Sequence, residues 1–140
     1  MARIGRRIAF DYGDVRIGVA ICDPDGILAT PIATLQSKNP ALKNEIANLL
    51  SEYEPVKAYV GNPKLLSGDD GEAVAKVLAF TEFLTKNFDL PITLVDERLS
   101  TVTASRQLRE SGIDAKSAKP LIDAAAAVAI LEQGLANESK

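Results

Sequence analysis

The stretch Ile8-Ala-Phe-Asp-Tyr-Gly-Asp-Val-Arg-Ile-Gly-Val-Ala-Ile21 decides the first part of the fold. An apolar run reaches Asp11, the chain turns through Gly13, and a second apolar run begins at Ile17. The pattern predicts two buried strands joined by a tight turn, with one carboxylate at the end of the first strand. Aspartate is unfavourable in strands. Asp11 therefore either opens the turn through an Asx-type hydrogen bond or binds a ligand, such as a divalent cation or a phosphate held through one.

Length and composition predict a single domain, residues 1–140, of ordinary globular character. The chain has 140 residues, of which 46% are hydrophobic and 25% are charged. No apolar run approaches the roughly eighteen residues of a membrane span, and the first residues lead into a strand pattern rather than a signal peptide. The one cysteine, Cys22, lies in an apolar strand, where we expect a small core residue. These features predict a protein of the reducing cytoplasm with no membrane partner.

The chain contains no histidine, which limits the chemistry available to it. Ser-His-Asp and Cys-His arrangements are excluded, as are the usual zinc sites that contain histidine. Any hydrolysis would have to depend on carboxylates. Ligand sets made only of oxygen atoms favour Mg²⁺ or Mn²⁺.

The net charge of −3 argues weakly against a general nucleic-acid binder, but the charges are unevenly distributed. Residues 40–97 hold ten acidic and five basic residues, whereas the two ends together hold eleven basic and nine acidic residues. The basic residues of the ends would form either a local basic rim or an ordinary solvated surface.

The rest of the chain predicts alternating helices and strands. Strands are expected at 6–12, 16–22, 27–35, 57–62 and 92–95, and helices at 40–53, 70–88, 100–111 and 119–136. Pro31 suits an edge strand, and Asn39-Pro40 and Lys119-Pro120 suit helix starts. The predicted fold is α/β: a mixed five-stranded sheet, with three antiparallel strands and then two parallel strands reached through helical crossovers, flanked by helices. Residues 64–71 form a candidate substrate loop.

Acidic residues occupy positions where ligands would converge. Asp11 ends the first strand, Asp96 and Glu97 end the last strand, and Asp123 lies in the otherwise apolar final helix. Sites in open α/β sheets form at the carboxyl ends of the parallel strands. Each acid also has a structural interpretation, since Asp96, Glu97 and Asp123 lie near helix starts, where the helix dipole favours negative charge. Taken together, they predict a metal site.

Four segments carry a resemblance to a known family: Asp11-Tyr-Gly with Arg16-Ile-Gly-Val-Ala, Val60-Gly-Asn-Pro63, Asp96-Glu-Arg-Leu-Ser-Thr101, and Ile122-Asp with Ala126-Ala127. They resemble the YqgF family, also described as RuvC-like or Holliday-junction-resolvase-like, within the RNase H-like superfamily. The resemblance covers nearly the whole chain in order.

The resemblance implies an RNase H-like fold and a metal-assisted nuclease acting on precursor rRNA, at the 5′ end of pre-16S rRNA, or on branched DNA. It implies Asp11, Glu97 and Asp123 as catalytic metal ligands, with Asp96 as the alternative to Glu97. Our hypothesis is hydrolysis with two ions of Mg²⁺ or Mn²⁺. Arg98 and Arg16 would hold neighbouring phosphates.

Asn62 and Lys64 are further predicted substrate contacts. The chain departs from the family at Leu65-Leu-Ser-Gly68 and in having few basic residues before Asp123, which bears on substrate affinity.

Two other functions are compatible with the sequence. Asp-x-Gly in a strand-turn-strand also resembles the phosphate-binding hairpin of sugar kinases and actin-like ATPases, which need two such domains. A non-catalytic RNA-binding assembly factor would suit the acidic net charge. The sequence leaves open whether the protein is a monomer or a homodimer.

Overall fold

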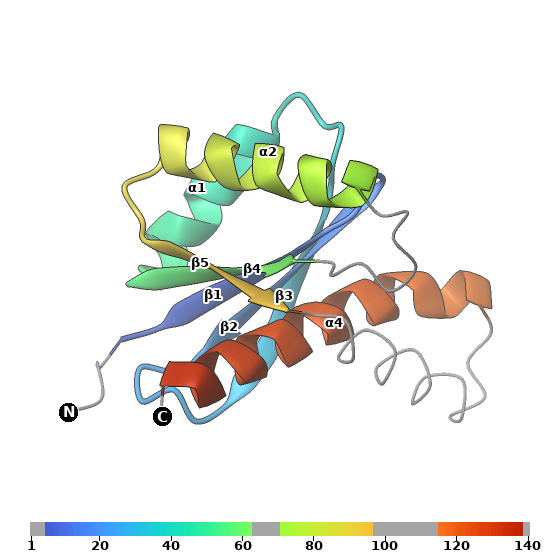
Figure 1. The fold of residues 1–140 in the computed structure, drawn as a ribbon. Helices are drawn as coiled ribbons and strands as arrows, with labels where there is room; N and C mark the ends of the chain where they lie inside the picture. The colour runs from blue at the N-terminus through green and yellow to red at the C-terminus, as the bar shows by residue number, and fades with distance from the viewer. Residues whose placement is uncertain (1–4, 63–70, 97–114, 139–140) are drawn as a thin grey trace.

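Residues 5–62, 71–96 and 115–138 are described by the computed structural model, and their N-terminal part is a three-stranded antiparallel meander (Figure 1). The strands are β1 (Arg7–Tyr12), β2 (Arg16–Cys22) and β3 (Ala29–Gln36). Asp11 on β1 pairs with Gly18 on β2. The register of β2 and β3 shifts between Val19 and Ala20, and β3 is an edge strand, as predicted from Pro31. A bulge and a proline both reduce the pairing capacity of an exposed edge.

Two parallel strands complete the sheet on the other side of β1. They are β4 (Lys57–Asn62), which follows helix α1 (Leu42–Tyr53), and β5 (Ile92–Asp96), which follows helix α2 (Gly71–Asn87). The strand order is β3-β2-β1-β4-β5, with β1, β4 and β5 parallel to one another. The last helix, α4 (Ala115–Glu138), closes the chain. The predicted mixed five-stranded α/β sheet is confirmed.

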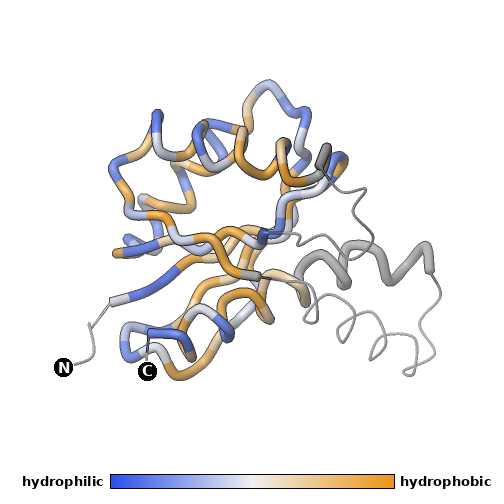
Figure 2. Tube along the Cα trace, in the orientation of Figure 1, coloured by the Kyte–Doolittle hydropathy of each residue, from blue (hydrophilic) through white to orange (hydrophobic). Residues whose placement is uncertain are grey.

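The helices cover both faces of the sheet. In Figure 1, α1 and α2 lie on one face and α4 crosses the other. The strand segments between these layers are mainly apolar in Figure 2, as expected for a sheet that is buried on both sides.

A separate apolar cluster lies on each face. On the α1–α2 side, Phe10 and Val60 pack with Ile46 of α1 and with Val77, Phe80 and Leu84 of α2. On the α4 side, the cluster consists of Ala9, Ala20, Cys22, Tyr59, Val95, Ala127, Ile130 and Leu131. Positions 8 and 10 of β1 therefore serve one face and position 9 serves the other, as strand alternation requires.

Both helices predicted to start at a proline start elsewhere. Helix α1 begins at Leu42 rather than Pro40, and Asn39 stabilises the preceding turn by accepting a hydrogen bond from the Ala41 N–H at 2.9 Å. Helix α4 begins at Ala115, so Pro120 lies in its second turn. The predicted helix at 100–111 lies outside the described residues. Within the described part of the chain, no helix is long and apolar enough to cross a membrane.

Candidate active site

The candidate site lies at the carboxyl edge of the three parallel strands. Asp11 is the penultimate residue of β1, Asn62 ends β4 and Asp96 ends β5. The backbone register pairs Asn62 with Asp96, and the β1–β4 pairing reaches Phe10 and Val60, one residue before Asp11. The sheet therefore brings the carboxyl ends of β1, which carries Asp11, and β5, which carries Asp96, to one edge. Only β4 lies between them.

The turn after Asp11 is held in a defined shape. A Cβ on Gly13 would lie 2.7 Å from the Arg16 carbonyl oxygen, so this close backbone approach requires glycine. Ser37 fastens the turn to the end of β3, because its Oγ donates to the Gly13 carbonyl oxygen at 2.5 Å and its N–H donates to the Val15 carbonyl oxygen at 2.9 Å. Asp11 therefore lies on a strand whose exit is fixed by two neighbouring strands.

Strand alternation places Asp11 on the α4 side of the sheet. Ala9, two residues earlier, belongs to the α4-side cluster, and positions 9 and 11 share a side. The residue opposite Asp11 on β2 is Gly18, and the next position on β4 after the Phe10–Val60 pair is Gly61. Neither neighbouring strand therefore places a side chain beside Asp11, which is only partly buried. The strand neighbours of Asp11 on both sides are therefore glycines.

Helix α4 runs antiparallel to β1 across that side. Arg7, at the start of β1, forms an ion pair of 2.9 Å with Glu138, at the end of α4, and Ala9 and Ala127 share the α4-side cluster. Asp11 lies two residues after Ala9 on β1, a rise of about 6.6 Å. Position 123 lies four residues before Ala127 on α4, a rise of about 6 Å. Positions 11 and 123 therefore advance toward the same edge by similar distances, and position 123 shares the helix face of Ala127.

The predicted substrate residues divide into three groups. Arg16, at the start of β2, is on the α4 side with Asp11, because Gly18 and Ala20 follow it at alternating positions. Asn62 is at the same edge but shares its side with Val60, which packs toward α1 and α2. Its Oδ1 is buried and accepts no hydrogen bond from the part of the chain that the structure describes. Glu97, Arg98 and Lys64 lie outside the described residues.

The described side chains include no group of three histidine, cysteine, aspartate or glutamate residues that could hold a metal ion. The side chains at 96 and 123, and the whole of residue 97, are outside the part of the chain that the structure describes, so the predicted metal site remains a prediction. The chemistry of its donors fits Mg²⁺ or Mn²⁺, since the predicted ligands supply carboxylate oxygens.

Two features near the site were not predicted from the sequence. The clasp from Ser37 to the β1–β2 turn joins residues that are 24 positions apart, and no local motif marks it. Asp14, one residue after Gly13, forms an exposed ion pair of 2.9 Å with Lys76 of α2. Cys22, by contrast, is buried as predicted, and burial raises the pKa of its thiol, so it is a core residue rather than a nucleophile.

Comparison with known proteins gives close relatives in sequence. A protein of Streptomyces coelicolor named "Putative pre-16S rRNA nuclease" is 52% identical over 138 residues, covering 97% of this chain and 83% of the relative. A protein of the same name in Rhodococcus opacus is 48% identical, covering 97% of this chain and 80% of the relative.

Similar solved structures share the fold at low sequence identity. The Thermus thermophilus RuvC structure in complex with a Holliday junction substrate superposes with a TM-score of 0.62 at 14% identity, covering 96% of both chains. The Fowlpox virus resolvase in complex with Holliday junction DNA gives a TM-score of 0.55 at 14% identity, covering 96% of this chain and 99% of the viral one. These structures confirm the RuvC-like, RNase H-like architecture.

The family described as "RuvX: Holliday junction resolvase" matches residues 5–137, which include every predicted acidic position. This is the family that the sequence motifs indicated under the name YqgF. Together with relatives at about half identity over nearly the whole chain, the match shows that this chain belongs to the RuvX family.

Proposed function

We propose that this protein is a metal-dependent endonuclease that hydrolyses phosphodiester bonds in processing the 5′ end of pre-16S rRNA. The observation that supports it most directly is the convergence of Asp11, the end of β5 and position 123 of α4 at one edge of the sheet. Family membership and the names of the relatives point to the same class of reaction.

Asp11, Glu97 and Asp123 are the proposed metal ligands. Val95 belongs to the α4-side cluster. The next residue, Asp96, pairs with Asn62 of β4 in the backbone register. A strand that continued by one residue would keep positions 95 and 97 on the side of Asp11. This spacing favours Glu97 over Asp96 as the second ligand.

Mg²⁺ or Mn²⁺ bound by these carboxylates, as one ion or two, would lower the pKa of an attacking water and offset the charge on the leaving 3′ oxygen. The chain's own contribution is to fix the ligands and the substrate. The rigid β1–β2 turn positions Asp11, and α4 positions Asp123. Arg16, at the same edge and on the same side, would hold a neighbouring phosphate. Arg98 and Lys64 are proposed for the same task from the sequence alone, and Asn62 would contact substrate from the other side of the sheet.

Precursor rRNA is the favoured substrate because relatives of about 50% identity are named for it, whereas the resolvases share 14% identity and thus only the fold. Branched DNA is the alternative. Resolution of a four-way junction needs two cuts, which a symmetric homodimer would supply, whereas a monomer would suffice to trim rRNA. We propose a cytoplasmic location, in keeping with the buried free thiol of Cys22.

The test is cleavage of an end-labelled pre-16S rRNA fragment and of a four-way DNA junction by the purified chain, with Mg²⁺, with Mn²⁺ and with EDTA. Replacing a direct metal ligand should cost at least roughly 100-fold in rate, since even residues that only orient ligands contribute about 10–100-fold. We therefore expect Asp11→Asn to retain its circular dichroism spectrum and to lose cleavage by at least that factor.

The substrate that is cut distinguishes rRNA processing from junction resolution. If the folded parent protein binds the rRNA fragment but cuts neither substrate with either metal, the nuclease proposal is wrong and a binding role in ribosome assembly replaces it. A rise in melting temperature on addition of ATP would instead revive the kinase-like alternative.

A further inference from the structure

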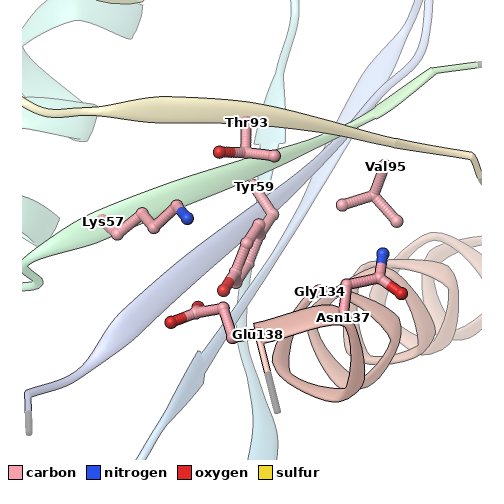
Figure 3. Close-up of a pocket in the computed structure, with 7 residues that line it drawn as sticks. All are labelled: Lys57, Tyr59, Thr93, Val95, Gly134, Asn137 and Glu138. Carbon is pink, nitrogen blue, oxygen red and sulfur yellow. The ribbon is translucent and has the colours of Figure 1, made fainter. Parts of the chain in front are cut away.

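Two hollows in the described part of the chain lie at opposite ends of the sheet. One, of about 280 Å³, lies between the start of β4 and the end of α4 and is lined in part by Glu138 (Figure 3). A carboxylate and the carboxyl end of a helix both disfavour an anionic ligand there. The other, of about 410 Å³, lies beside the β1–β2 turn that follows Asp11, and it is lined by Asp14, Val15, Gln36, Lys38 and Asn39. Only this second hollow, which we call the turn hollow, is at the same end of the sheet as the candidate active site.

Hydrogen bonds hold the walls of the turn hollow in place. Ser37, which follows β3, joins the two walls, because its Oγ donates to the Gly13 carbonyl oxygen in the β1–β2 turn. Both polar atoms of the Asn39 side chain are taken, since Oδ1 accepts from the Ala41 N–H at 2.9 Å and Nδ2 donates to Glu45 Oε1 at 3.0 Å. The hollow is therefore preformed, which lowers the cost of ordering it when a ligand binds.

Three exposed side chains of the turn hollow are available to a ligand. Val15 is 58% exposed, in a turn where small or polar residues are the usual choice. Gln36 and Lys38 are exposed too, and neither side chain forms a hydrogen bond or ion pair with the part of the chain that the structure describes. The Asp14 carboxylate pairs with Lys76 at 2.9 Å, and we assign it no contact with a ligand. The hollow therefore offers an apolar surface, an amide and an ammonium group.

Gln36 connects the turn hollow to the side of the sheet on which Asp11 lies. Gln36 pairs with Arg16 in the β2–β3 register, and the preceding residue, Leu35, packs toward α1 and α2. Gln36 is therefore on the α4 side with Arg16 and Asp11. Two strand spacings and two residues of strand rise separate the Cα atoms of Asp11 and Gln36, about 12 Å. Arg16 lies between them, so a nucleic-acid strand that extends from Asp11 past Arg16 would reach the hollow.

The three available side chains fit an unpaired nucleotide. An apolar side chain packs against the face of a base, an amide both donates and accepts hydrogen bonds at its edge, and an ammonium group binds phosphate. The volume is within the range of small-ligand pockets, about 300–1,000 Å³. A base within a duplex is stacked on both faces and paired at its edge, so only an unstacked base would enter such a hollow. The hollow therefore favours a single-stranded segment.

We propose that the turn hollow binds one unpaired nucleotide of the RNA strand that lies at Asp11. The base would pack against Val15, the Gln36 amide would contact the base edge, and Lys38 Nζ would contact the adjoining phosphate. This proposal rests on the proposed function and adds that the substrate is single-stranded next to the scissile bond. Single-stranded DNA carries the same kind of base, and we assign RNA because the proposed function acts on rRNA.

The experiment measures binding of short fluorescein-labelled strands to the full chain by fluorescence anisotropy, in EDTA, so that neither metal nor cleavage contributes. The probes are a single-stranded RNA, the same sequence as single-stranded DNA, and the blunt RNA duplex. We expect the single-stranded RNA to bind most tightly. Val15→Ser and Gln36→Ala should each weaken its binding about fivefold, as expected for one lost apolar or hydrogen-bonded contact. Ile27→Ser is the control for Val15→Ser, since Ile27 is 80% exposed at the opposite end of β2.

Lys38→Gln tests the phosphate contact through its dependence on salt. Loss of one phosphate contact should reduce the slope of log K against log salt concentration by about 0.7 for a single strand. Lys86→Gln is the matched control and should leave the slope unchanged. Lys86 is an exposed lysine of the last turn of α2, about 15 Å along the helix from Lys76, which lies next to the hollow through its ion pair with Asp14.

The proposal is overturned if the blunt duplex binds as tightly as the single strand, if Val15→Ser and Gln36→Ala bind like the parent, or if Lys86→Gln changes the slope as much as Lys38→Gln. Binding of single-stranded DNA as tight as that of RNA would overturn the assignment to RNA. The substituted side chains are exposed, so each variant should keep the melting temperature of the parent. Because binding is measured without cleavage, a parent protein that binds the single strand through the hollow but cuts nothing would contradict the nuclease proposal alone.

Discussion

The two sides of the sheet are packed in different ways. The α1–α2 side contains large rings in contact, with Phe80 of α2 5.7 Å from Phe10 and 4.9 Å from Tyr12 between ring centroids. The α4 side combines a few large residues with small ones, among them Ala9, Ala20 and Ala127. One side is built for buried apolar volume and the other for close approach of a helix.

The difference explains where polar residues occur. The distance between packed elements depends on the size of the side chains at the contact. Alanines and Gly134 allow α4 to lie close to the strands. The carboxylate edge is on this side. The α1–α2 side supplies most of the apolar core that supports it.

The largest expected effect on stability is on the aromatic side. Phe80→Ala removes a ring that is 5% exposed, and we expect a loss of about 3–5 kcal/mol in the free energy of unfolding. Urea denaturation would measure it. Leu78→Ala on the same helix, at a side chain 49% exposed, is the control and should cost less than about 1 kcal/mol. Equal losses in the two variants would contradict the assignment of the core to this face.

The sequence predicted the sheet and the candidate site to different extents. Alternating apolar residues around Gly13 and the two helical crossovers correctly predicted a mixed sheet of five strands. The helix starts at Pro40 and Lys119-Pro120 were wrong, because proline is common in the first turn but does not fix which residue is first. Asn39 Oδ1 accepts a hydrogen bond from the Ala41 N–H, and α1 begins one residue after Ala41.

The positions of the acids followed from strand ends, since parallel strands end at a common edge. The side of the sheet on which each residue lies was harder to predict from the sequence, because it depends on which apolar cluster the neighbouring residues of its strand belong to. Asn62 is at the predicted edge but on the side of Val60. The Arg7–Glu138 pair, which aligns α4 with β1, joins residues 131 positions apart, and no local pattern could indicate it.

An intermediate effect is expected where α4 meets the sheet most closely. In an exposed helix position, replacing glycine by alanine would stabilise by roughly 1 kcal/mol. At Gly134 the added Cβ would lie 2.8 Å from the Tyr59 ring, so Gly134→Ala should destabilise by about 1–3 kcal/mol and lower nuclease activity by displacing α4. Thermal unfolding and cleavage assays would measure both. Tyr59→Leu should restore part of the stability in the double variant, whereas a more stable Gly134→Ala would show that the helix is not so closely packed.

A smaller effect is expected at the far end of α4. The Arg7 side chain is 4% exposed and keeps its charge in Glu138→Gln, where only the neutral amide oxygen remains to accept its hydrogen bond. We expect a loss of about 1 kcal/mol. Denaturation at low and high salt would test it, because a buried pair is screened much less than an exposed one. The matched control is Glu132→Gln, an exposed residue of the same helix, and a similar loss there would mean that the helix responds to charge in general.

The smallest effect on stability and cleavage is expected for Asp14→Asn. This variant distinguishes a specific role of the Asp11 carboxylate from a general effect of negative charge near the turn. Asp14 pairs with Lys76 at 2.9 Å, but the two side chains are 63% and 41% exposed, so Asp14→Asn should cost less than about 1 kcal/mol. Cleavage should be unchanged, since Asp14 lies in the β1–β2 turn, after the end of β1 and outside the converging strand ends. The comparison with Asp11→Asn changes one carboxylate to an amide in both variants, three residues apart. If both lose cleavage alike, the loss would reflect the electrostatic field of the turn, and Asp11 would no longer be supported as a metal ligand.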